Sequence, residues 1–236
     1  MNTLIYSQNA IIKLINQNPD IIIILYILKV NKKTIYIAQQ AKKLKINIIY
    51  IKNISNKNSS YLKKYNSIIC KIKTSEKKDY NLEELIKNKK INKILILDRI
   101  QDPYNFSACI RTAEAFSFDT IITNDKNTIK QSSLINKISN GANLFTTIIC
   151  EKNILNKISL LKKYNFKIIG LSSKSKTILK DELIPPLAII VGSEKNGINK
   201  ELMKECTDTY KIQMKNSCKN INVSVITGII LSKIIN

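Results

Sequence analysis

The chain has 236 residues, with 39 Lys and Arg against 17 Asp and Glu, and its 44% hydrophobic content is enough to form a core. It contains no histidine, which excludes Ser-His-Asp and Cys-His catalysis, a histidine general base and histidine-ligated zinc. Five scattered cysteines without a C-x-x-C pair favour buried thiols in a reducing cytoplasm over a zinc site or a disulfide framework.

The first 73 residues alternate between helical and strand patterns and predict a small α/β unit. Ser7 to Gln17 places apolar residues on one helical face behind a Ser7 N-cap, and Pro19 ends this helix. After it we expect a strand at 21–28, a helix at 32–44, and strands at 46–51 and 67–72. Residues 74–90 are the most polar stretch, with a short helix around 82–87, and are expected to link two domains.

The second part of the chain alternates in the same way, and its strands are continuous runs of Ile, Val and Leu. Such strands indicate a parallel sheet that is covered on both faces. The expected strands are 93–97, 119–123, 144–149, 166–170, 187–192 and 209–214. The expected helices are 105–116, 132–138, 153–164, 199–206 and 223–235. The fold class is therefore α/β in both parts.

No membrane segment is expected. The longest apolar run, residues 21–28, is far shorter than the roughly 20 residues of a transmembrane helix. The N-terminus has no basic region before an apolar stretch, so no signal peptide is expected either.

The charge of +22 is unevenly distributed. Between Asp20 and Glu76 there are 12 lysines and no acidic residue, which favours a surface that faces RNA. The alternative is a solvated surface in a lysine-rich composition. Arginine occurs only as Arg99 and Arg111, which indicates that the planar guanidinium matters at these two positions.

Scarce glycines mark a candidate ligand crevice. Gly170 and Gly192 each follow an apolar strand, and in α/β sheets ligands bind at the carboxyl ends of strands. A tight turn without a ligand is the alternative for either glycine. The chain has neither G-x-G-x-x-G nor G-x-x-x-x-G-K-[ST], which disfavours nucleotide phosphates and suits a cofactor without them.

Polar residues also cluster where the strand at 93–97 gives way to a helix. Asn105 lies at the expected cap of that helix, and Arg111 follows within two turns, so both could line one crevice. The alternative is an N-cap with an arginine paired to Asp98 or Asp102. Glu194 after Gly192 could likewise cap a helix or touch a ligand.

The order and spacing of three segments resemble one known family. LDRIQDPYNFSACIRTAEAFSFDTII, LAIIVGSEKNGINKEL and KIQMKNSCKNINVSVITGI resemble, in order, the three motifs of the SpoU/TrmH family of RNA ribose 2′-O-methyltransferases, over about residues 93–235. The first 73 residues are similar to the small substrate-binding domain of its RlmB-type branch, which methylates large-subunit rRNA.

This resemblance implies an RNA-binding domain at 1–73, a linker at 74–90 and a methyltransferase domain at 91–236 that carries a deep trefoil knot. It also implies S-adenosylmethionine as the cofactor, no metal, and a homodimer. The implied catalytic residues are Asn105, Arg111, Glu194 and Asn222. The implied cofactor contacts are Leu171, Ser172, Gly192, Ile212 and Ile221.

The implied reaction is 2′-O-methylation of a ribose, a guanosine of large-subunit rRNA, in the cytoplasm, with no DNA or membrane partner. Because a guanidinium stays protonated, we expect Arg111 to clamp a neighbouring phosphate and polarise the hydroxyl. A tRNA 2′-O-methyltransferase is one alternative, and a non-catalytic RNA-binding or ribosome-assembly protein is another. The chain departs from the family pattern at Ser107, Gln213, Asn216, Asn220 and Ile226, which we interpret as drift in an A/T-biased genome.

Overall fold

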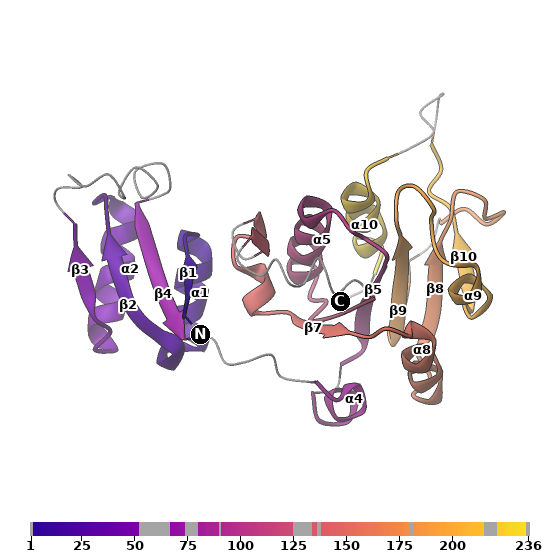
Figure 1. Ribbon diagram of the computed structural model, residues 1–236, viewed down its shortest axis with the longest axis horizontal. Coiled ribbons are helices and arrows are strands. Elements are labelled where there is room, and N and C mark those ends of the chain that lie inside the picture. Colours follow the sequence, from indigo (N-terminus) through magenta and orange to yellow (C-terminus); the bar gives the residue numbers. More distant parts are fainter. Residues whose placement is uncertain are drawn as a thin grey trace. The chain divides into compact units, whose positions relative to one another are not determined.

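The computed structural model describes residues 2–51, 67–73, 80–89, 91–124, 134–135, 138–179, 182–214 and 221–234. The chain divides into two compact units, residues 1–78 and 79–236, and each has its own sheet (Figure 1). Within the described ranges, no helix is both long enough and apolar enough to cross a membrane.

The first unit has a four-stranded sheet in the order β1-β4-β2-β3, and its described residues include helices α1 and α2. Strand β4 pairs antiparallel with β1 and β2, while β3 pairs parallel with β2. The elements are β1 (Asn2–Ile5), α1 (Gln8–Gln17), the 3-10 turn η1 (Pro19–Ile21), β2 (Ile22–Ile27), α2 (Lys32–Lys43), β3 (Ile48–Tyr50) and β4 (Ile68–Lys73).

Local sequence accounts for both helices of this unit. Helix α1 begins at the predicted cap, where Ser7 Oγ accepts the Ala10 N–H at 3.4 Å. Helix α2 begins at a capping box, in which Asn31 Oδ1 accepts the Thr34 N–H at 3.0 Å and Thr34 Oγ1 accepts the Asn31 N–H at 2.8 Å. The two helices contact each other through their apolar sides.

The second unit is a six-stranded, all-parallel sheet in the order β10-β8-β9-β5-β6-β7. Its strands are β5 (Lys93–Asp98), β6 (Thr120–Thr123), β7 (Thr147–Cys150), β8 (Lys167–Leu171), β9 (Leu187–Gly192) and β10 (Asp208–Tyr210). The helices among its described residues are α4 (Leu82–Lys89), α5 (Pro103–Ala115), the 3-10 turn η3 (Ala142–Leu144), α8 (Ile154–Lys163), α9 (Lys200–Lys204) and α10 (Val223–Leu231).

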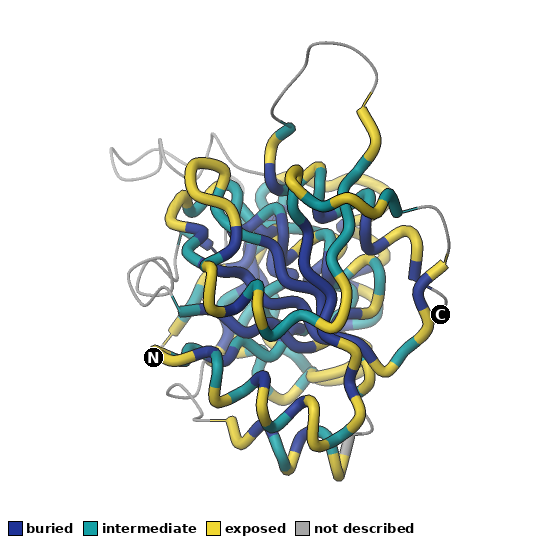
Figure 2. Tube along the Cα trace, turned by 90° about the vertical axis from the view of Figure 1, so that its right-hand side faces the viewer, coloured by how far each residue is buried: buried dark blue, intermediate teal, exposed yellow. Residues whose placement is uncertain are grey.

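Helices cover both faces of this sheet, as the continuous apolar strands predict. Along β9, Leu187, Ile189 and Val191 join a core that includes buried residues of α5 and α10. The residues between them, Ala188 and Ile190, join a second core with α4, α8 and α9. This alternation follows from the two-residue period of a strand. The buried positions are dark blue in Figure 2.

The strand order creates a topological switch point between β5 and β9. After β5 the chain enters α5 on one face of the sheet, and after β9 it enters α9 on the other. The two strands are neighbours, with Asp98 paired to Gly192 at their carboxyl ends. A crevice at such a point is where open α/β sheets bind ligands.

Helix α5 begins earlier than predicted, which corrects the assignment of its cap. The helix starts at Pro103, and the N-cap is Asp102, whose carboxylate accepts the N–H groups of Tyr104 and Asn105. Proline is favoured at this first helical position because its missing N–H needs no partner there. Asn105 therefore lies inside the helix, and its side-chain amide is available for other contacts.

Several strands are shorter than predicted, and the pattern at 46–51 forms only the three residues of β3. The pattern at 144–149 divides into η3, which begins after Gly141 at φ 83°, and β7. The pattern at 209–214 forms only the three residues of β10, followed by a single bridge between Ile178 and Lys211. The predicted helix at 132–138 lies largely outside the described residues.

The thiols are buried or half-buried wherever the structure describes them, as predicted. Burial raises the pKa of Cys70 to about 12 and that of Cys109 to about 11. Both thiols are therefore protonated and unreactive at neutral pH. Cys218 lies outside the described residues.

Ser107 is fully buried in α5, at one of the positions where the chain departs from the family pattern. Its hydroxyl has no hydrogen-bond partner in the described part of the chain. Ser107→Ala removes that unpaired group and improves helix propensity, so it is expected to raise the free energy of unfolding by about 1 kcal/mol. Urea unfolding followed by circular dichroism measures the change.

Ser159→Ala is the matched control in α8. The Ser159 side chain is exposed and its Oγ donates to the Leu155 carbonyl at 3.1 Å, so this variant is expected to stay within about 0.5 kcal/mol of the wild type. A Ser107→Ala protein that is less stable than the wild type would contradict the conclusion that the Ser107 hydroxyl is unpaired.

Candidate active site

Three segments meet at the switch point. The first is the loop from β5 to α5, the second is the loop from β9 to α9, and the third is the start of α10. All three lie where a strand ends or a helix begins, so backbone and capping groups fix their shape. The segments are far apart in sequence, and hydrogen bonds join them across the switch point.

The loop after β9 turns back on itself at two glycines. Gly197 has φ 64°, a conformation that favours glycine, and its N–H donates to the Ser193 carbonyl at 2.7 Å. A Cβ on Gly192 would lie 2.1 Å from the Gly197 carbonyl carbon, so the close approach requires glycine at 192. The close packing within this loop therefore explains the glycine at 192, which the sequence pattern indicates as a candidate ligand contact.

The buried carboxylate of Asp98 ties this loop to β5. Asp98 is fully buried, and its Oδ2 accepts the Asn199 N–H at 2.7 Å. Its Oδ1 accepts the Asn124 side-chain amide at 3.1 Å, and Arg99 Nη2 lies 3.3 Å from Oδ2 as an ion pair. A buried charge with this many donors is stable, and it fixes the ends of β5 and β9 relative to each other.

Three of the four predicted catalytic residues meet in one hydrogen-bonded group. The Asn105 side-chain amide donates to Glu194 Oε1 at 3.1 Å, and the Asn222 amide donates to Asn105 Oδ1 at 2.9 Å. Glu194 Oε1 also accepts the Val223 N–H at 3.3 Å, at the start of α10, where the helix dipole favours a negative charge. Each residue comes from a different motif.

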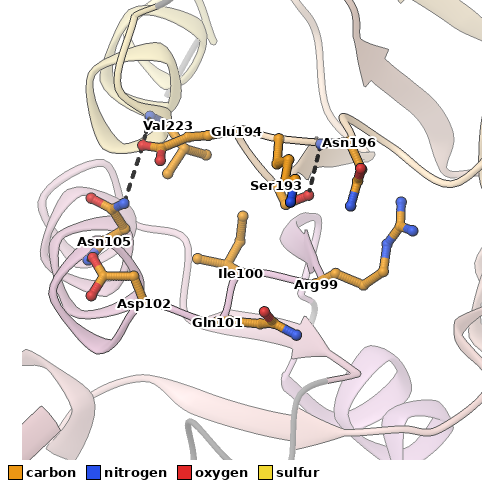
Figure 3. A pocket seen from close by; sticks show the side chains of 10 residues that line it. Arg99, Ile100, Gln101, Asp102, Asn105, Ser193, Glu194, Asn196 and Val223 are labelled. Carbon is orange, nitrogen blue, oxygen red and sulfur yellow. Dashed lines mark hydrogen bonds between the residues drawn. The ribbon is translucent and has the colours of Figure 1, made fainter.

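This group borders a pocket of about 240 Å³ (Figure 3). In Figure 3, Asn105 and Asp102 lie at one end of the pocket, and the side chains of Arg99 and Asn196 lie at the other. The lining residues are Arg99, Ile100, Gln101, Asp102, Asn105, Ser193, Glu194, Lys195, Asn196 and Val223. The pocket therefore offers amides and carboxylates at one end and a guanidinium at the opposite end.

Arg111, the fourth predicted catalytic residue, lies apart from this group. It is exposed on α5 and has no hydrogen bond or ion pair with the residues that the structure describes. Arg111 follows Asn105 by six positions, so its side chain leaves the helix about 120° away around the axis. Its predicted role remains a prediction.

The predicted cofactor residues lie near the carboxyl ends of the neighbouring strands β10, β8 and β9 and just before α10. Leu171 is nearly buried, while Ile212 and Ile221 are half-buried. The Ser172 N–H donates to the Tyr210 carbonyl at 3.0 Å, and Gly192 ends β9. Of these residues only Gly192 adjoins the pocket described above, through its neighbour Ser193.

These residues fit S-adenosylmethionine by their chemistry. Their side chains are apolar or small and none is charged, which suits an adenosine that carries no phosphate. The loop after β8 is held against the segment after β10, since Ser175 Oγ donates to the Thr209 carbonyl at 2.7 Å and the Leu179 N–H donates to the Lys211 carbonyl at 3.1 Å. Within the described ranges, no three His, Cys, Asp or Glu side chains gather as ligands for a metal ion.

Sequence reasoning did not assign several residues that line the pocket. Arg99 had a signal, because it is one of only two arginines in a chain rich in lysine. Gln101, Ser193 and Asn196 had no signal of their own, since each is a common loop residue whose position depends on how the loop folds.

A substitution of Asp98 tests whether its carboxylate holds the loops around the site together. Asp98→Asn removes the negative charge that pairs with Arg99. It also places an amide NH₂, which is itself a donor, next to the Asn199 N–H or the Asn124 amide. The free energy of unfolding is therefore expected to fall by about 2–3 kcal/mol. Asp119→Asn is the same change at an exposed carboxylate and is expected to cost less than about 0.5 kcal/mol. Equal urea midpoints for the two variants would contradict the role of Asp98.

The chain is similar to known proteins over almost its full length. The model of the SpoU rRNA Methylase family matches residues 92–232. The 23S rRNA (guanosine-2′-O-)-methyltransferase RlmB of Blochmanniella floridana is 32% identical over 98% of this chain and 93% of its own length.

Two solved structures share the fold. An RNA 2′-O ribose methyltransferase has a TM-score of 0.74 at 18% identity, covering 98% of this chain and 87% of its own. The AdoMet-bound rRNA methyltransferase of Sinorhizobium meliloti has a TM-score of 0.69 at 17% identity, covering 98% and 86%. The family match spans the strands and loops that build the site, and the chain belongs to the SpoU rRNA methylase family.

Proposed function

We propose that this protein transfers a methyl group from S-adenosylmethionine to the 2′-hydroxyl of a guanosine ribose in large-subunit rRNA. The observation that carries the proposal is the hydrogen-bonded group of Asn105, Glu194 and Asn222, which gathers one residue from each of three motifs beside a pocket. The full-length similarity to the RlmB protein of Blochmanniella floridana supports the choice of rRNA and guanosine.

The reaction requires a hydroxyl oxygen to attack a methyl carbon in line and to lose its proton. Positioning the hydroxyl and stabilising the charge that develops on its oxygen are the tasks left to the protein. Bound S-adenosylmethionine supplies an electrophilic methyl group on a sulfonium. Leu171, Ser172, Gly192, Ile212 and Ile221 would hold it, through apolar contacts and backbone groups.

Glu194 is suited to accept a hydrogen bond from the ribose 2′-hydroxyl. Both of its hydrogen bonds within the described residues go to Oε1, which leaves Oε2 able to accept a hydrogen bond from the ribose. Asn105 and Asn222 fix the orientation of this carboxylate, since Asn105 bonds to both of the other two side chains. An oriented acceptor of this kind lowers the cost of aligning the attacking oxygen.

The first unit is proposed to bind the RNA. Helix α2 exposes Lys32 and Lys33 near its start and Lys42 and Lys43 near its end, and the surrounding sequence has no acidic residue between Asp20 and Glu76. A positive field of this extent attracts phosphates without reading sequence. The linker expected at 74–90 is proposed to lie before α4, which packs in the second unit, and a cytoplasmic location belongs to the same proposal.

A trefoil knot in the second unit is also part of the proposal. Isolated bridges join Ile178 to Lys211 and Leu183 to Ile234, so the connection between β8 and β9 lies along two later segments of the chain. This proximity is compatible with one segment passing through the loop of another. A crystallographic trace through residues 172–234 tests the threading.

A methyl-transfer assay tests the function. Purified protein is incubated with radiolabelled S-adenosylmethionine and separate unmodified rRNA and tRNA transcripts, and the modified ribose is mapped. Label on a guanosine 2′-oxygen of the rRNA is expected. Label on tRNA alone would favour the tRNA enzyme, and RNA binding without S-adenosylmethionine binding would favour a non-catalytic protein.

Arg111→Lys tests the proposed phosphate clamp. Lysine keeps the charge but loses the planar fork, so turnover is expected to fall at least about tenfold while calorimetry shows unchanged affinity for S-adenosylmethionine. Lys163→Gln, an exposed cation at the end of α8, is the control and should leave turnover unchanged. Near-normal turnover of Arg111→Lys would refute the clamp.

Light scattering after size exclusion tests the homodimer. Helices α5 and α10 contact each other, and they expose Tyr104 at 62% and Val225 at 50%, which is apolar area that a second copy could cover. We expect twice the chain mass for the wild type and a shift toward the monomer for Val225→Lys. A monomeric wild type at micromolar concentration would contradict the dimer.

A further inference from the structure

Arg99 is a cation in the pocket that none of the predicted roles uses. It lines the same pocket as Asn105 and Glu194, and Figure 3 shows its side chain at the end opposite Asn105. Lys195 also lines the pocket, but the Arg99 side chain is held in place by a hydrogen bond to Gly197 in the loop after β9 and by an ion pair with the neighbouring Asp98. Its position therefore depends on the folded site and not on a flexible surface chain.

The backbone of Arg99 adopts a conformation that arginine disfavours. Its φ is 59°, in the left-handed region where glycine and asparagine are the usual residues. The Arg99 N–H donates to Asn124 Oδ1 at 2.9 Å, and Nη2 donates to the Gly197 carbonyl at 3.2 Å. These bonds hold the turn, and the turn aims the side chain into the mouth of the pocket.

The guanidinium is only partly occupied by the protein. Within the described part of the chain, both of its contacts, to Gly197 and to Asp98, use Nη2. Among the described residues, Nη1 has no acceptor and the buried Nε has no partner, while the side chain as a whole is 38% exposed. Unpaired donors on a cation at a pocket favour an anionic ligand, and a guanidinium matches phosphate oxygens in particular.

The substrate offers such an anion at a suitable place. In RNA, the 3′-phosphodiester is attached to the carbon next to the one that bears the 2′-hydroxyl. A ribose whose hydroxyl lies at Glu194 therefore brings a phosphate into the same pocket. We propose that Arg99 binds a phosphodiester adjacent to the methylated ribose. This inference rests on the proposed function, and it places the phosphate at the end of the pocket opposite Asn105.

A purely structural role is the competing explanation, since Arg99 also neutralises Asp98. The two roles differ in salt dependence. A phosphate contact contributes to the release of counterions, so its loss weakens RNA binding and lowers the slope of log Kd against log salt by about 1. Loss of a structural ion pair changes stability but leaves that slope unchanged.

The test compares Arg99→Gly, Arg99→Lys and the wild type in full-length protein. Glycine accepts φ 59° without strain, so the variant removes the guanidinium while relieving the turn. With an unmodified large-subunit rRNA transcript, Arg99→Gly is expected to raise Kd about tenfold and to reduce the salt slope by about 1. Arg99→Lys should keep the slope and lose part of the affinity.

Lys167→Gln is the matched control, because it removes one exposed positive charge at the amino end of β8, away from the carboxyl ends that form the pocket. Its Kd and salt slope are expected to equal those of the wild type. An Arg99→Gly protein with the wild-type slope, or one that loses only stability and cofactor binding, would overturn the proposal. Absence of methyl transfer by the wild type bears on the proposed function alone, because the RNA-binding difference between wild type and Arg99→Gly still decides the role of Arg99.

Discussion

The site depends on one buried carboxylate at the junction of two neighbouring strands. Asp98 accepts the Asn199 N–H and the Asn124 amide and is paired with Arg99, so it holds together the loops that follow β5, β6 and β9. The bond from Asn199 to this carboxylate and the bond from Arg99 to Gly197 join the loop after β9 to the end of β5, in addition to the strand pairing itself. The position of Glu194 follows from that loop, and the proposed contact with the ribose hydroxyl depends on Glu194.

The architecture of the second unit was predictable because its strands are buried on both faces. Runs such as LAIIVG contain no alternation of polar and apolar residues, and only a sheet between two helical layers can bury them. The strand order was not predictable from these runs. Which strands become neighbours depends on how connections cross the sheet, and the apolar side chains of β5, β8 and β9 are too alike to specify it.

The site was predictable in part, for reasons that differ between residues. Asn105, Glu194 and Asn222 were found through three motifs in order, and their contacts bring them together. The cap of α5 was assigned wrongly to Asn105, because Asp102 and Pro103 offered an earlier start with a better oxygen acceptor. Arg99 was noted but not placed, since a residue in the left-handed region takes its direction from a turn that sequence patterns do not specify.

The contacts of the active site span unusually long stretches of chain. Asn105 meets Glu194 across 89 residues and Asn222 across 117. Closing such loops is entropically costly and slow, so these bonds form late, after the sheet has brought the strand ends together. The group of Asn105, Glu194 and Asn222 is therefore complete only once the start of helix α10 has docked against α5 and the loop after β9.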